Sequence, residues 1–140
     1  MNKKADAYFS RARTLDGLIC SQNELLDTWR SRALKITSSV RSAPVSSSES
    51  SRPMADAVDA YQDFETSVLS DISAYIRELS EIRSTIAAVP DPECRLILEK
   101  RYLLGLSTSQ IAEVRCCSVS SVQRLLRRAL DLAVLPSSST

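Results

Sequence analysis

The chain contains no histidine and only two glycines among its 140 residues. Histidine is the commonest general base and metal ligand, so its absence excludes serine–histidine and cysteine–histidine catalysis and zinc sites of the Cys₂His₂ type. Sheets and phosphate-binding loops need glycine at turns and close backbone approaches, and two glycines supply few such positions. The sequence therefore favours a helical protein that is not an enzyme, with no catalytic residue, cofactor or metal.

Long apolar runs are also missing. No run approaches the roughly 20 residues that span a bilayer, and the first residues lead into no apolar core of a signal peptide. We therefore expect a cytoplasmic protein without a membrane partner. Its four cysteines fit reduced thiols and, lacking a Cys-x-x-Cys pair, predict small buried side chains rather than a zinc site.

The formal net charge of +1 is a sum of unlike segments. Residues 1–52 carry nine basic and five acidic side chains, and residues 53–90 carry two and seven. Residues 91–140 carry seven basic and five acidic side chains. An asymmetry of this kind is informative about partners, which the near-neutral total conceals.

Two long heptad patterns predict two long helices. The apolar positions of residues 1–37 keep a 4-3 spacing over four heptads, and those of residues 54–89 do the same with one acidic interruption. The first seam is Tyr8, Ala12, Leu15, Ile19, Gln22, Leu26, Trp29, Ala33 and Ile36. The second is Val58, Tyr61, Glu65, Val68, Ile72, Tyr75, Leu79, Ile82, Ile86 and Val89. Eight serines and two prolines between them, in residues 38–53, predict a flexible linker, and residues 136–140 predict a disordered tail.

Helices of equal length joined by a linker predict a long antiparallel, coiled-coil-like hairpin. The first helix is basic and the second acidic, so they attract each other. In the rival arrangement one or both helices pair with a second copy, as a homodimer through the long helices. The sequence leaves both open, although a linker of this length makes closure within the chain inexpensive.

Prolines at positions 90 and 92 end the second helix, and residues 90–135 then predict a compact module of three helices. The first is expected at residues 92–103. Ser107 with Gln110 three residues later forms a capping box that opens the next helix, and Ser118 caps a last helix at residues 118–135. The expected fold is all-α, with the hairpin followed by a C-terminal helix-turn-helix module.

The spacing of the last two helices is typical of a helix-turn-helix, with the last helix as the recognition helix. One arc of that helix is apolar: Val119, Val122, Leu125, Leu126, Ala129, Leu130 and Ala133. The opposite arc, about 160° wide at 100° per residue, holds Ser120, Ser121, Gln123, Arg124, Arg127, Arg128 and Asp131. The candidate DNA-binding residues are the cap Ser118 and, on this arc, Ser120, Ser121, Gln123, Arg124, Arg127 and Arg128.

Gln123 and Arg124 would read base edges in the major groove, while Ser118, Ser120, Arg127 and Arg128 would hold phosphate. Arginines also gather near the end of ordinary surface helices, where they complement the helix dipole. The capped helix before it and the clean polar arc favour double-stranded DNA as the partner.

The stretch from Asp91 to Ser107 (DPECRLILEKRYLLGLS), followed by residues 111–113 (IAE) and 122–125 (VQRL), resembles region 4 of sigma-70 factors. Residues 7–13 (AYFSRAR), with the linker and the second long helix, resemble short prophage-encoded proteins related to phage late-gene transcriptional regulators of the ArpU type. The resemblance implies a sequence-specific transcriptional regulator in a bacterial host, with RNA polymerase as a further partner. No segment resembles the sigma region that binds core polymerase and melts the promoter, so a complete sigma factor is not expected.

Two residues depart from that family's pattern, which usually has glycine at Cys116 and a large apolar residue at Arg115. A cysteine is strained there if the backbone needs a positive φ, and Arg115 removes a packing contact. Two other functions stay open. One is a small terminase subunit that recognises viral DNA for packaging, which the order of the parts ranks lower. The other is a coiled-coil interaction protein that binds no DNA, which the two departures support.

Overall fold

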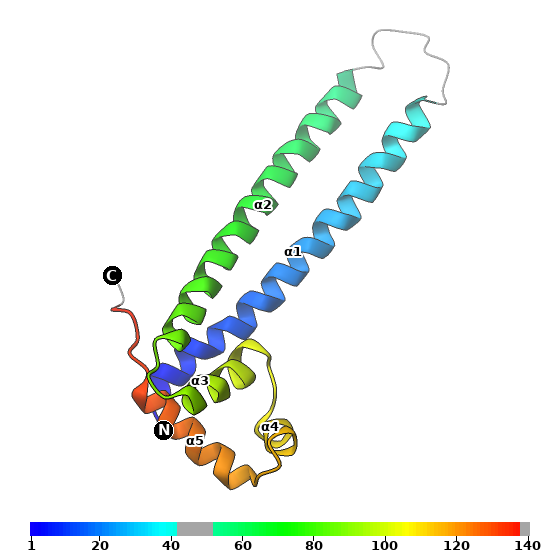
Figure 1. Ribbon diagram of the computed structural model, residues 1–140. Coiled ribbons are helices and arrows are strands. Elements are labelled where there is room, and N and C mark those ends of the chain that lie inside the picture. The colour runs from blue at the N-terminus through cyan, green and yellow to red at the C-terminus, as the bar shows by residue number, and fades with distance from the viewer. Residues whose placement is uncertain (42–51, 138–140) are drawn as a thin grey trace. The chain divides into compact units, whose positions relative to one another are not determined.

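The structure is a computed structural model that describes residues 1–41 and 52–137, with side chains for residues 1–35 and 55–137. In chain order the elements are α1 (Lys3–Arg41), α2 (Arg52–Ala87), α3 (Pro92–Leu98), the π-helical turn η2 (Glu99–Leu103), α4 (Thr108–Val114) and α5 (Val119–Leu132) (Figure 1). The predicted all-α class is confirmed, since the described residues contain no strand. None of these helices combines the length and the apolar character needed to cross a membrane.

Several boundaries differ from the predicted ones. Residues 38–41 and 52–53 of the predicted linker continue α1 and α2 as helix, while residues 42–51, like residues 138–140 of the tail, lie outside the described residues. α5 ends at Leu132, three residues earlier than predicted, and Ala133 is extended. Pro136 disfavours helical geometry at Leu135, and Val134 is almost fully exposed, so another turn would bury little.

The helix predicted at residues 92–103 is an α-helix that widens into η2. The Leu104 N–H donates to the Glu99 carbonyl, five residues back, over 2.9 Å. Gly105 then ends the helix with a φ of 72°, and the Leu106 N–H donates to the Lys100 carbonyl. A glycine in this left-handed conformation is the usual way to satisfy the last carbonyl groups of a helix.

Contacts divide the chain into two compact units, and the first is built from both chain ends, residues 1–17 and 76–140. Its α1 segment runs antiparallel to the end of α2, because Tyr8 Oη lies 3.1 Å from Thr85 Oγ1 and Arg11 Nε lies 2.8 Å from Glu78 Oε1. Figure 1 shows this start of α1 in blue. The buried side chains are Ala5, Phe9, Ala12, Leu15, Ile82, Ile86, Val89, Cys94, Ile97, Leu98, Tyr102, Ile111, Ala112, Val122, Leu126, Ala129 and Leu130.

Tyr102 joins η2 to the start of α1. Its ring packs on Phe9, with 5.5 Å between the ring centroids, and its hydroxyl donates to Asp6 Oδ1. Burial, and then the nearby Asp6 carboxylate, raise the pKa of Tyr102 well above its ordinary value. Phe9 lies outside the predicted seam, yet it is fully buried because this module packs against α1.

The second unit, residues 18–75, is a two-helix hairpin. Its core is Leu26, Val68 and Ile72, with Ile19 and Phe64 packed against them. Arg30 Nη2 lies 2.6 Å from Glu65 Oε1, and donation to that carboxylate raises the pKa of Arg30. These antiparallel contacts lie within one chain, which is the first of the two arrangements that the sequence left open. Trp29 and Val58, predicted in the seam, are 42% and 43% exposed.

Of the four cysteines, expected to be buried, Cys94 alone is so. Burial raises the pKa of its thiol, and Asp91 adds to the effect. Cys20, Cys116 and Cys117 are exposed thiols. In the described part of the chain, no group of three cysteine or acidic side chains is placed to hold a metal ion.

Candidate nucleic-acid interface

α4 begins with the predicted capping box, which is confirmed. The Gln110 N–H donates to Ser107 Oγ over 3.1 Å, and the Ser107 N–H donates to Gln110 Oε1 over 2.8 Å. Both bonds satisfy backbone donors that a helix start leaves without intrahelical partners. Ile111 and Ala112 are buried, whereas Val114 is 64% exposed. The cap and the two buried side chains fix the first helix of the pair.

The connection to α5 turns at Cys116, whose φ is 53°. The Cys117 N–H donates to the Ala112 carbonyl over 3.0 Å, and the Cys116 N–H donates to the Glu113 carbonyl over 3.2 Å. This pair of bonds is the Schellman motif, which normally places glycine at the left-handed position. A side chain there costs about 1 kcal/mol or more. The strain predicted at Cys116 is therefore present, and the turn keeps its ordinary geometry.

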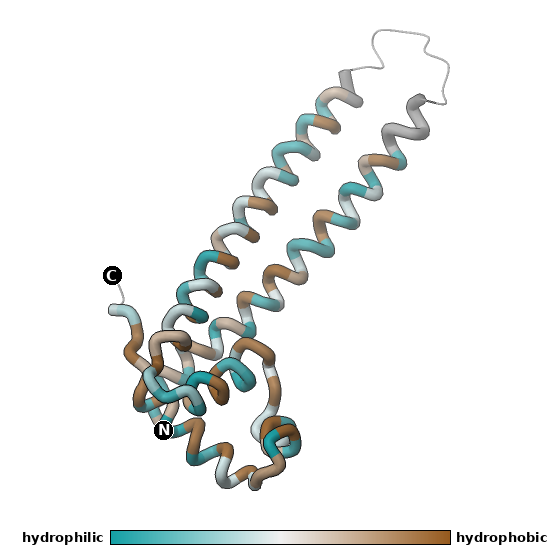
Figure 2. The backbone as a smooth tube through the Cα atoms, viewed as in Figure 1, coloured by the Kyte–Doolittle hydropathy of each residue, from teal (hydrophilic) through white to brown (hydrophobic). Residues whose placement is uncertain are grey.

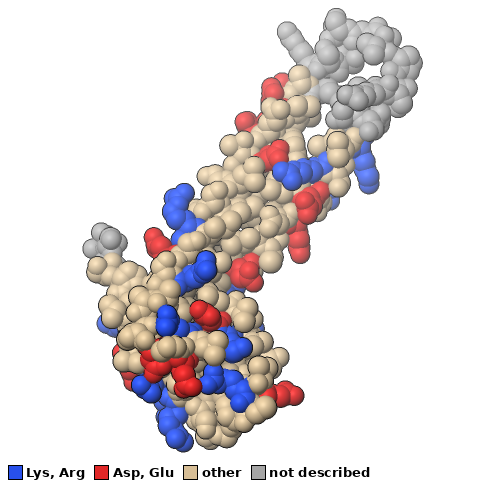
Figure 3. All heavy atoms as spheres, in the orientation of Figure 1, with Lys and Arg blue, Asp and Glu red and all other residues tan. Residues whose placement is uncertain are grey.

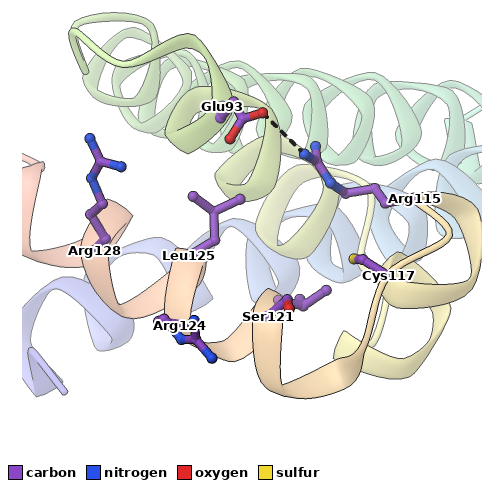
Figure 4. Close-up of a pocket in the computed structure, with 8 residues that line it drawn as sticks. Glu93, Arg115, Cys117, Ser121, Arg124, Leu125 and Arg128 are labelled. Carbon is purple, nitrogen blue, oxygen red and sulfur yellow. Dashed lines mark ion pairs between the residues drawn. The ribbon is translucent and has the colours of Figure 1, made fainter.

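Arg115 stands where the family pattern has a large apolar residue. It makes a polar contact there in place of the apolar one. Its side chain is 23% exposed, and Nη2 lies 3.6 Å from Glu93 Oε1 in the first turn of α3 (Figure 4). The side chain therefore links the turn to α3. The two departures noted in the sequence leave the α4–α5 geometry intact.

α5 holds its apolar face in the core and its polar arc in solvent. Ser118 caps it as predicted, because the Ser121 N–H donates to Ser118 Oγ over 3.1 Å. Val122, Leu126, Ala129 and Leu130 are buried. The seven predicted site residues are all exposed: Ser118, Ser120, Ser121, Gln123, Arg124, Arg127 and Arg128. Figure 2 shows the resulting alternation of hydrophobic and hydrophilic residues along α5.

Three of these seven residues already have partners within the protein. Ser118 Oγ and Ser121 Oγ lie 2.9 Å apart, so a phosphate contact by Ser118 would compete with its capping role. Arg128 Nη2 lies 2.9 Å from Asp91 Oδ2. Asp91 also caps α3 by accepting from the Glu93 N–H over 2.9 Å. That backbone hydrogen bond, helped by Arg128, lowers the pKa of Asp91.

A groove of about 350 Å³ extends the polar arc of α5 toward α3. Arg115, Arg124 and Arg128 line it together with Glu93 and Ser121 (Figure 4). The sequence did not reveal Arg115 as a site residue, because it showed only that a packing residue was absent there. Besides α5, two elements contribute to this groove. The α4–α5 connection contributes the basic Arg115, and the start of α3 contributes the acidic Glu93 that pairs with it.

A family model described as Sigma-70, region 4 matches residues 79–132. The match begins within α2 and ends at the last residue of α5, so it includes the three capped helices α3, α4 and α5 and the Cys116 turn. Residues 79–132, which contain the helix-turn-helix of α4 and α5, are similar to sigma-70 region 4. Comparisons with curated proteins and with solved structures found no match. We call residues 79–132 the region 4 module.

The first turn of α5 in the region 4 module differs from the prediction at Val119. The periodicity places this residue in the apolar arc, but it is 38% exposed. The buried side of α5 begins at Val122, one turn later, so the helix start projects beyond the residues on which α5 packs. Periodicity alone could not detect this, because it does not tell where a packing surface begins.

Proposed function

We propose that the region 4 module binds double-stranded DNA in a sequence-specific manner and that the protein is a phage or prophage transcriptional regulator. The observation that carries the proposal is the exposed arc of α5, with three arginines on a helix whose opposite face is fixed in the core. An α-helix with its side chains is about 10–12 Å across and fits a major groove about 12 Å wide. It would act in the cytoplasm of a bacterial host, as a binding protein and not as an enzyme.

The residues of the arc have different tasks in this proposal. Gln123 and Arg124 read base edges, because their long side chains can make two hydrogen bonds to one base. Arg127 and Arg128 hold phosphate, and Arg128 exchanges Asp91 for the DNA backbone. Exposed Val119 adds an apolar contact that suits the thymine methyl group. The similarity to sigma-70 region 4 supports RNA polymerase as a further partner.

A titration of labelled DNA over a range of salt concentrations tests the proposal. Arg124→Ala with Arg127→Ala should weaken binding and flatten the salt dependence by about 0.9 in log–log slope for each phosphate that is no longer neutralised. Arg77→Ala with Arg83→Ala is the matched control, because both arginines are exposed on α2. Unchanged affinity in the α5 double variant would contradict the assigned face.

Two further measurements separate this function from the alternatives. A genome-wide map of bound DNA finds the site, and replacing each thymine of that site by deoxyuridine locates the base that Val119 contacts. Light scattering reports the assembly, since a ring of many subunits would support DNA packaging instead. Absence of any DNA association at low salt, where non-specific binding is strongest, would support an interaction protein without DNA binding.

A further inference from the structure

The start of α1 contacts the C-terminal helices of the first unit along a single line of side chains. Asn2 Nδ2 donates to a carbonyl of α5 over 3.5 Å, and Asp6 accepts from the Tyr102 hydroxyl. Phe9 packs on the ring of Tyr102. At 100° per residue, Asn2, Asp6 and Phe9 lie within about 60° of one another, and Arg13 falls inside the same arc. Arg13 therefore continues this line of contacts by one more turn of α1.

Arg13 lies against Gly105, in the turn that follows η2. A Cβ at Gly105 would lie 3.7 Å from Arg13 Nε and 3.9 Å from Arg13 Cζ, so the guanidinium covers the side of the glycine where a side chain would stand. Arg101 lies at the same loop, because its Nη1 donates to the Leu106 carbonyl over 3.3 Å. Two guanidinium groups, one from α1 and one from η2, therefore make the loop of residues 104–106 positively charged.

The charge of Arg13 is not neutralised within the protein. Three other arginines of the first unit pair with acidic side chains: Arg11 with Glu78, Arg115 with Glu93 and Arg128 with Asp91. Around α3 to α5, Figure 3 shows blue basic side chains close to red acidic ones. Among the described residues, no ion pair includes Arg13 or Arg101. Since Arg13 is also exposed, its guanidinium is available to an anion from outside the protein.

The loop that Arg13 covers leads directly into the helix-turn-helix. Ser107, the cap of α4, follows Gly105 by two residues, which is at most about 7 Å of chain. In a helix-turn-helix bound to DNA, the second helix enters the major groove while the first crosses the DNA backbone. When α5 occupies the groove, a DNA strand therefore passes close to the start of α4 and to the loop before it.

We propose that Arg13 holds a phosphate of the DNA backbone beside the start of α4, so that α1 extends the interface made by α5. The inference rests on the proposed function. It adds a contact that the likeness to sigma-70 region 4 does not supply, because Arg13 lies outside residues 79–132. A guanidinium can bind phosphate through two parallel hydrogen bonds. Such a contact carries no sequence information, so Arg13 adds affinity and fixes the orientation of the region 4 module on the duplex.

The salt dependence of DNA binding by the full chain tests the proposal. Arg13→Gln removes the charge, and it should flatten the log–log slope by about 0.9 and weaken binding to all duplexes, whatever their sequence. Arg13→Lys keeps the charge and should keep the slope. The matched control is Arg11→Gln, two residues earlier on α1, because Arg11 is already paired with Glu78. This variant should leave the slope unchanged.

Uncharged phosphates in the DNA give a second, independent readout. Each phosphate of the bound site is replaced in turn by a neutral methylphosphonate, which weakens binding wherever the protein holds that phosphate. At one position the replacement should weaken binding by the unaltered protein and have no further effect on Arg13→Gln. Arg127→Ala should lose its sensitivity at a different phosphate, because Arg127 belongs to α5.

The outcomes separate this inference from the proposed function. An unchanged slope in Arg13→Gln, with weaker binding in the Arg124 and Arg127 variant, would overturn the Arg13 contact and leave the α5 interface in place. Equal flattening in Arg13→Gln and Arg11→Gln would also overturn it, because the effect would then follow net charge and not position. Absence of DNA binding by the unaltered protein would contradict both the contact and the proposed function.

Discussion

At Cys116 the residue and its backbone conformation are mismatched. The φ of 53° and the two Schellman hydrogen bonds are those of a turn that usually contains glycine. The exposed thiol has no packing role that would compensate for the strain. The turn is therefore held by what flanks it: the buried Ile111 and Ala112 before it and the Ser118 cap after it.

Cys116→Gly should stabilise the protein by about 1 kcal/mol, because it removes the left-handed strain of a side chain. Urea unfolding followed by circular dichroism measures the change. Cys117→Gly is the control at the neighbouring exposed position, where φ is not positive, and it should destabilise by about 0.5–1 kcal/mol. A lower unfolding midpoint for Cys116→Gly would show that the turn is not strained.

At the scale of the elements, what the sequence predicted correctly is local. The Ser107 capping box, the Ser118 cap and the exposed arc of α5 each depend on residues within a turn or two of one another. Phe9, η2 and the exposure of Trp29 depend instead on which distant segment packs where. A heptad pattern predicts that a helix packs lengthwise against another segment. It does not predict where along the helix one packing segment ends and another begins.

The contacts of Tyr102 with Phe9 and Asp6 allow the contribution of this non-local packing to stability to be measured. Tyr102→Phe keeps the ring on Phe9 but removes the hydrogen bond to the Asp6 carboxylate, and it should destabilise the first unit by about 1.5 kcal/mol. The pKa of Tyr102 is raised, so its contribution is complete below the unfolded value near 10 and is lost as pH rises above it.

Thermal unfolding at pH 8 to 11 tests both parts of this prediction. The stability difference between the protein and Tyr102→Phe should be constant up to pH 9 and change above pH 10. Tyr75→Phe, a substitution in the second unit, should still lose stability above pH 10, because Tyr102 is unchanged in it. An identical pH profile for the protein and Tyr102→Phe would show that the Tyr102–Asp6 contact is absent in solution.

At the scale of the whole molecule, the region 4 module is not complete by itself. Residues 1–17 belong to its compact unit, and Ala5, Phe9 and Leu15 are as fully buried as Ile97 or Leu130 within the module. Asn2 Nδ2 even reaches the Leu130 carbonyl of α5, 3.5 Å away. The stability of α5 therefore depends on residues at the opposite end of the chain.

Phe9→Ala should destabilise the first unit by about 3 kcal/mol or more, because it leaves a cavity beside Tyr102. Amide hydrogen exchange in α5 should accelerate accordingly, and DNA affinity should fall without any change to the contact surface. Leu26→Ala is the control, since Leu26 is as deeply buried but lies in the core of the second unit. It should accelerate exchange around Val68 and Ile72 and leave α5 protected. Equal exchange in α5 for both variants would mean that the chain ends do not form one cooperative unit, and that residues 79–132 fold without residues 1–17.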